Sequence, residues 1–106
     1  MHEPVREIDI GRNIRMIEWL KVEIIGGVAE LFKQLPKGRD DLVTAALANL
    51  IMCCYLLGRR LGLSYSKLEA AVERKVERNV EEGHEIEAWY QDLSTLLQHF
   101  EARRNK

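Results

Sequence analysis

Residues 42–58, with the sequence LVTAALANLIMCCYLLG, contain no charged side chain and only one strongly polar one, that of Asn49. Two aspartates precede the segment and two arginines follow it, so the apolar stretch is sharply bounded. A helix that is apolar on every face has to be covered on every face. The segment therefore predicts the central helix of an all-α core.

The length and net charge of the chain limit the number of domains and the kinds of partner that can be expected. A chain of 106 residues suits a single domain, and a formal net charge of −1 gives no sign of a nucleic-acid partner. The apolar run, at about 17 residues, lies at the lower limit for a membrane span. Its alanine-rich composition and its amphipathic neighbours favour a buried helix, and we expect no membrane partner.

The two cysteines, Cys53 and Cys54, are adjacent in this segment. Neighbouring side chains on a helix point in different directions, so the two thiols cannot form a disulfide without severe distortion. Free thiols suit a reducing compartment. The charged first residues also lack an apolar signal-peptide region. We therefore expect a cytoplasmic protein.

Apolar residues recur at three- and four-residue steps in several parts of the chain, which is typical of helices, and no segment alternates like a strand. Capping and stop signals at the ends of these parts predict four helices, over residues 13–35, 39–61, 65–82 and 84–102. Short links between them favour an antiparallel bundle. Because one small chain can hardly enclose its second helix, we expect a homodimer or homotetramer.

The first third of the chain contains proline and glycine residues that can interrupt a helix. Pro4 and Gly11 predict an extended N-terminal arm over residues 1–12. Gly26 and Gly27 fall in the middle of the first predicted helix, where each costs about 1 kcal/mol relative to alanine. Either a neighbouring backbone approaches closely at this point or the helix kinks.

Three stretches resemble the motifs of the MazG-like all-α nucleotide pyrophosphohydrolases. VEIIGGVAE at residues 22–30 is similar to the first motif, E-E-x-x-E. LANLI at residues 47–51 and LLGRRLG at residues 56–62 are similar to the second, E-x-x-D, and to the end of its helix. KVERN at residues 75–79 is similar to the third, which contains Lys, Asn or Arg. In that family the carboxylates hold Mg²⁺ on the phosphates of a nucleoside triphosphate, and water releases pyrophosphate and the monophosphate.

The motif positions that usually bind the metal are altered in this chain. Glu23 matches the first glutamate of E-E-x-x-E, but Ile24 and Gly27 stand at its other two acidic positions. Ala46 and Asn49 stand at the E-x-x-D pair. Mg²⁺ needs several hard oxygen ligands, and isoleucine, glycine and alanine supply none. Ordinary pyrophosphohydrolase activity is therefore not expected.

Five residues are candidates for a ligand site, and none is identified as catalytic. Glu23 and Glu30 share a helix face and, with Asn49, are candidate metal ligands. A solvated helix rim for the glutamates and a polar specificity contact for Asn49 are the alternatives. Lys75 and Asn79 share a face of the third predicted helix, where the resemblance implies contact with phosphate or nucleotide. A solvated charged face is the alternative for this pair.

Three functional hypotheses follow. In the first, the chain is a catalytically degenerate MazG-like protein that serves as an oligomeric nucleotide-binding or regulatory module. In the second, it is an active nucleoside triphosphate pyrophosphohydrolase that uses Mg²⁺ and relocated carboxylates. In the third, it is a purely structural helical interaction module.

Overall fold

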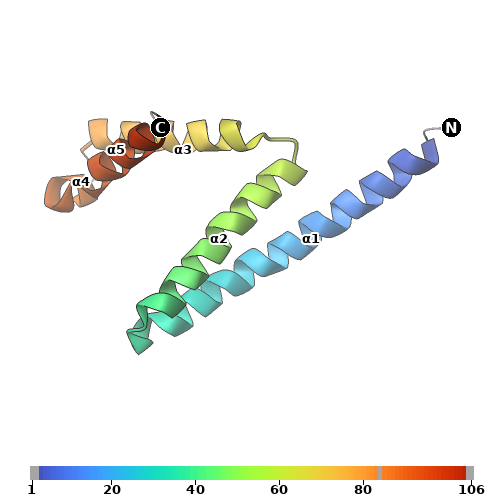
Figure 1. Ribbon diagram of the computed structural model, residues 1–106, viewed down its shortest axis with the longest axis horizontal. Helices are drawn as coiled ribbons and strands as arrows, with labels where there is room; N and C mark the ends of the chain where they lie inside the picture. Colours follow the sequence, from blue (N-terminus) through green and yellow to red (C-terminus); the bar gives the residue numbers. More distant parts are fainter. Residues whose placement is uncertain (1–2, 84, 105–106) are drawn as a thin grey trace. The chain divides into compact units, whose positions relative to one another are not determined.

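A computed structural model describes residues 3–83 and 85–104, and this part of the chain contains helices and no strand (Figure 1). The elements are α1 (Glu3–Gln34), the short 3₁₀ helix η1 (Leu35–Lys37), α2 (Asp40–Arg60), α3 (Tyr65–Glu81), α4 (Glu85–Tyr90) and α5 (Asp92–Arg104). The predicted all-α class with four substantial helices is therefore confirmed. The chain divides into two compact units, one ending at Tyr65 and one beginning at Ser66, which are described separately.

Helix α1 begins ten residues earlier than predicted. The described part of the predicted extended arm, from Glu3 to residue 12, is helical, so this prediction was wrong; residues 1 and 2 lie outside the described range. Pro4 falls in the first turn, where its missing N–H removes no helical hydrogen bond. Gly11 lies inside the helix, and a methyl group there would meet nothing within 4 Å. Neither residue therefore interrupts the helix.

Helices α1 and α2 form an antiparallel hairpin (Figure 1). The turn uses Gly38, whose φ of 66° is the left-handed conformation that glycine adopts without strain. Asp40 and Asp41 then occupy the first turn of α2, where negative charge complements the positive end of the helix. At the other end, Gly62 has a φ of 92°, and the N–H groups of Leu61 and Leu63 both donate to the carbonyl of Gly58. Both ends of α2 therefore have local stop signals.

The two helices of the hairpin approach closely at Gly27. A Cβ atom on Gly27 would lie 2.9 Å from Cδ2 of Leu50 and 3.5 Å from Nδ2 of Asn49, whereas one on Gly26 would meet nothing within 4 Å. The atoms that lie close to Gly27 belong to the side chains of Leu50 and Asn49 and not to a neighbouring backbone, and this close approach is found at Gly27 alone. Leu20 and Cys53 are fully buried in the same hairpin.

Much of the apolar surface of the hairpin is uncovered. In α2 only Cys53 and Gly58 are buried, although the helix carries no charge between its first and last turns. By length and composition alone, α2 is long and apolar enough to cross a membrane, and 17% of its most apolar stretch is buried. In the first unit, the large apolar side chains that are more than half exposed are Ile10, Ile14, Val22, Ile25, Phe32, Ile51, Leu61 and Tyr65.

In the second unit, α3 buries Val76 and Glu73. The Glu73 carboxylate pairs with Arg104 of α5, with 2.9 Å between Nη1 and Oε2. The single helix predicted over residues 84–102 is instead two, α4 and α5, with residue 84 outside the described range. The break is at Gln91, whose φ of 56° cannot continue a right-handed helix, and Asp92 then begins α5.

The contact at Gly27 predicts opposite effects of the same substitution at neighbouring positions. Gly27→Gln should lower the free energy of unfolding by about 1–3 kcal/mol, because the added side chain overpacks the contact with Leu50. Gly26→Gln should raise it by up to about 1 kcal/mol, because glutamine is the better helix former and meets open space. Urea unfolding monitored by circular dichroism measures both. Changes of the same sign in the two variants would contradict the packing.

Candidate functional site

Glu23 and Asn49 lie in the middle of the hairpin, on facing helices. Asn49 of α2 lies against Gly27 of α1, and Glu23 precedes Gly27 by one helical turn. Cys53, one turn beyond Asn49, donates its thiol to Oδ1 of Asn49 at 3.9 Å. Burial raises the pKa of the Cys53 thiol, and the negative charge of Glu23 adds to this effect. We call Glu23, Asn49 and Cys53 the central cluster.

The central cluster does not suit Mg²⁺. It offers one carboxylate, from Glu23, and one neutral amide oxygen, from Asn49, whereas Mg²⁺ requires a nearly octahedral set of hard oxygen atoms. The raised pKa of Cys53 keeps its thiol protonated at neutral pH, and a thiol is neither a strong nucleophile nor a metal ligand. Within residues 3–83 and 85–104, no group of three or more His, Cys, Asp and Glu side chains is arranged to hold a metal ion.

Glu30 is bonded along its own helix. Its Oε1 accepts a hydrogen bond of 2.7 Å from Nε2 of Gln34, one turn further on. Gln34 is buried, and its Oε1 has no hydrogen-bond partner. No hydrogen bond in the described part of the chain joins Glu30 to Glu23 or Asn49. The proposed metal-ligating role of Glu30 stays a prediction.

Lys75 and Asn79 belong to the second unit. They lie one turn apart on α3, where Lys75 is exposed and Asn79 is half-buried. The central cluster belongs to the first unit. The predicted contact of Lys75 and Asn79 with phosphate or nucleotide also stays a prediction.

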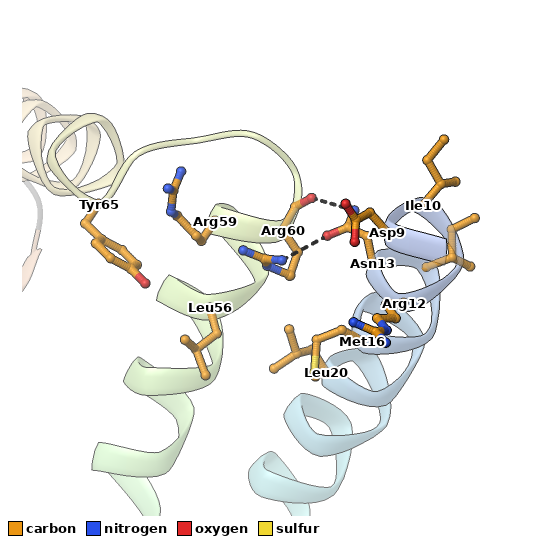
Figure 2. Close-up of a pocket in the computed structure, with 11 residues that line it drawn as sticks. Asp9, Ile10, Arg12, Asn13, Met16, Leu20, Leu56, Arg59, Arg60 and Tyr65 are labelled. Carbon is orange, nitrogen blue, oxygen red and sulfur yellow. Dashed lines mark hydrogen bonds between the residues drawn. The ribbon is translucent and has the colours of Figure 1, made fainter. Parts of the chain in front are cut away.

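A second site, absent from the sequence-based candidates, lies at the open end of the hairpin (Figure 2). It is a pocket of about 820 Å³ within the first unit. The residues that line it are Asp9, Ile10, Arg12, Asn13, Ile14, Met16, Leu20, Leu56, Arg59, Arg60 and Tyr65. We call it the arginine pocket. Its α1 wall includes part of the segment predicted as an extended arm, which is why sequence reasoning missed it.

One side of the arginine pocket is held by a pair of hydrogen bonds between α1 and α2. Nδ2 of Asn13 donates to the carbonyl of Arg60 at 3.0 Å, and Nη1 of Arg60 donates to Oδ1 of Asn13 at 3.3 Å (Figure 2). On the other side, the guanidinium of Arg59 lies 5.9 Å from the ring centre of Tyr65. The rings of Tyr55 and Tyr65 are in a T-shaped arrangement, with 6.2 Å between ring centres. The polar rim of the pocket is therefore partly ordered by contacts within the unit.

Comparison with known proteins gives one match. A family model described as the MazG-like family matches residues 10–93, which include nearly all of α1 to α4. No curated protein matches the chain significantly. No solved structure does so either. Because the family model covers most of the chain, including the Gly27–Asn49 contact and α3, the chain belongs to the MazG-like family.

Proposed function

We propose that this protein is a catalytically degenerate relative of the nucleotide pyrophosphohydrolases, which acts as an oligomeric nucleotide-binding or regulatory module. Membership of the MazG-like family supports the relationship. The single observation that carries the loss of catalysis is the contact of Gly27 with Leu50 and Asn49. The resemblance implies metal-binding carboxylates at this point of the hairpin. In this chain a glycine stands there, with the side chains of Leu50 and Asn49 packed against it.

The motif positions agree with this interpretation. Gly27 and Asn49, which match the last glutamate of the first motif and the aspartate of the second, are neighbours across the hairpin. Their proximity supports the register of the resemblance, since ligands of one metal ion have to converge. Ile24 and Ala46, the other two altered positions, are half-buried and carry no oxygen in their side chains. Restoring one carboxylate would therefore leave the ligand set incomplete.

The exposed apolar surface supports an oligomer. Single-chain soluble proteins rarely leave contiguous apolar patches of this kind uncovered. A second copy is favoured over a bilayer because α1 carries Glu18, Lys21, Glu23 and Glu30 along the stretch that pairs with α2. Charged side chains at membrane depth are costly. A homodimer or homotetramer in the cytoplasm, with no nucleic-acid partner, is the arrangement we propose.

A working Mg²⁺-dependent hydrolase is the second candidate, because Glu23 and Asn49 still converge in the central cluster. On this hypothesis Glu23 and Glu30 are ligands, Lys75 binds phosphate, and the products are the monophosphate and pyrophosphate. This hypothesis requires that Glu23→Gln abolish activity. If the protein is catalytically degenerate, the wild type already shows no pyrophosphohydrolase activity.

The first prediction of the proposal concerns nucleotide binding without turnover. Nucleoside triphosphates should raise the melting temperature by several degrees with or without Mg²⁺, because a ligand that binds only the folded state stabilises it. Pyrophosphate release should stay at the level of a protein-free blank with Mg²⁺ or Mn²⁺. Metal-dependent release that disappears in Glu23→Gln would establish the hydrolase instead. Absence of any thermal shift would favour a purely structural module.

The second prediction concerns assembly. The protein should be a dimer or tetramer by size-exclusion chromatography with light scattering at micromolar concentration. Ile25→Glu, at a side chain that is 72% exposed, should shift the population toward monomer, because a buried unpaired carboxylate at a subunit contact is costly. Lys33→Glu, on an exposed position of the same helix, is the control and should leave the mass unchanged. A monomeric wild-type protein would contradict the oligomer.

A further inference from the structure

The arginine pocket has the charge and shape of a site for a phosphorylated ligand. We propose that it binds a nucleoside polyphosphate, with the phosphates on Arg12 and Arg59 and the base against the apolar wall. The proposal rests on the nucleotide-binding function proposed above. It assigns the binding to residues different from Lys75 and Asn79.

The arginine pocket carries more positive than negative side chains. Three arginines, Arg12, Arg59 and Arg60, and one aspartate, Asp9, line the pocket, so cations are in excess. No ion pair joins any of the three arginines to an acidic group in the described part of the chain. A guanidinium stays charged at every physiological pH, and its planar fork of N–H donors matches the oxygens of a phosphate. The pocket therefore offers several cationic donors that the protein itself leaves uncompensated.

The C-terminal end of α2 lies at the pocket, and carbonyl groups without hydrogen-bond partners at a helix end repel an anion. The last four carbonyls of the helix all accept hydrogen bonds. Those of Leu57 and Gly58 accept from the N–H of Leu61, and that of Arg59 accepts from the N–H of Gly62. The carbonyl of Arg60 accepts from Nδ2 of Asn13. The last carbonyls of α2 are thus engaged in hydrogen bonds within the unit.

The pocket also has an apolar wall. It consists of the exposed Ile10, Ile14 and Met16 on α1, the half-buried Leu56 on α2, and Tyr65, whereas the completely buried Leu20 adds no accessible surface. The guanidinium of Arg59 lies 5.9 Å from the centre of the Tyr65 ring, and no ion pair with a described residue engages its N–H donors. A volume of about 820 Å³ falls within the range of small-molecule sites, which combine an apolar lining with a few polar groups. A nucleotide has both parts, whereas a bare phosphate would leave the apolar wall unused.

Isothermal titration calorimetry of the full chain tests the proposal with ATP, CTP, inorganic tripolyphosphate and adenosine. Arg12→Gln and Arg59→Gln should each weaken triphosphate binding about tenfold or more, because each removes a charge-assisted hydrogen bond. Tripolyphosphate should compete with the nucleotides, and adenosine should bind far more weakly than ATP. Arg60 is left intact because it also bonds Asn13.

Two matched controls separate this site from the alternatives. Lys33→Gln removes an exposed cation of α1 that lies roughly 30 Å along the helix from Arg12, and it should leave the affinity within about twofold, as a distant surface charge is screened. Lys75→Gln removes the position implied by the family resemblance and should also have little effect. Circular dichroism confirms that each variant is folded. If Arg59→Gln unfolds, the affinity of Arg12→Gln decides the test. The Arg12 side chain makes no hydrogen bond or ion pair with a described residue, so its replacement should leave the fold intact.

Two results would overturn the proposal, and they differ in what they leave standing. Unchanged affinity in both arginine variants, with loss of binding in Lys75→Gln, would overturn the arginine pocket and leave the proposed nucleotide-binding function intact. A wild-type protein that binds no triphosphate and no tripolyphosphate would overturn both.

Discussion

The contact between Gly27 and Leu50 determines the geometry of the hairpin. A hydrogen atom in place of a side chain lets α2 approach α1 at this point, at the cost of about 1 kcal/mol in helix propensity. The approach brings Asn49 against α1 and buries Cys53 completely. It also fills the space in which a longer side chain at position 27 would lie. At this position the chain therefore has contact with the side chains of Leu50 and Asn49 in place of the carboxylate that the family resemblance implies.

The core formed by this packing is small. Leu20 and Cys53 are the only described side chains that are completely buried, and both lie in the hairpin. Of the two, only Leu20 is a large apolar side chain, and its burial contributes about 1.5–3 kcal/mol, which offsets little of the entropy lost by ordering two long helices. On the oligomer that we propose, a second copy would supply the missing burial. Folding and assembly would then be linked, and stability would depend on protein concentration.

Most of the fold follows from local signals in the sequence. The bounds of α2 and α3 agree with the prediction to within one residue, because paired aspartates, terminal arginines and capping groups are read from neighbouring residues. The start of α1 was wrong because Pro4 was taken as a helix breaker, although proline is tolerated in a first turn. The break at Gln91 was missed because a glutamine in the left-handed conformation leaves no signature of glycine or proline.

The candidate site was predictable only in part, for a related reason. The meeting of Gly27 and Asn49 follows from a motif register that spans two helices. The arginine pocket depends on α1 continuing through Arg12, so an error about the arm also hid the pocket. Arg59 and Arg60 were interpreted as a helix stop, which they are, but both residues also line the arginine pocket. A terminal cation can serve a helix end and a ligand at once.

The two sites together suggest how the family scaffold could bind a nucleotide and leave it intact. About ten residues of α1 separate Asn13 from Glu23, which corresponds to about 15 Å along a helix. Phosphates held on Arg12 and Arg59 would thus lie away from the central cluster. Fixed guanidinium groups would neutralise their charge, which is one of the tasks of Mg²⁺ in a hydrolase. They would not replace its other task, because an arginine neither lowers the pKa of a bound water nor accepts its proton. On the function that we propose, binding without hydrolysis would be the chemical consequence of neutralising phosphates with arginines while glycine, isoleucine, alanine and asparagine occupy the metal positions.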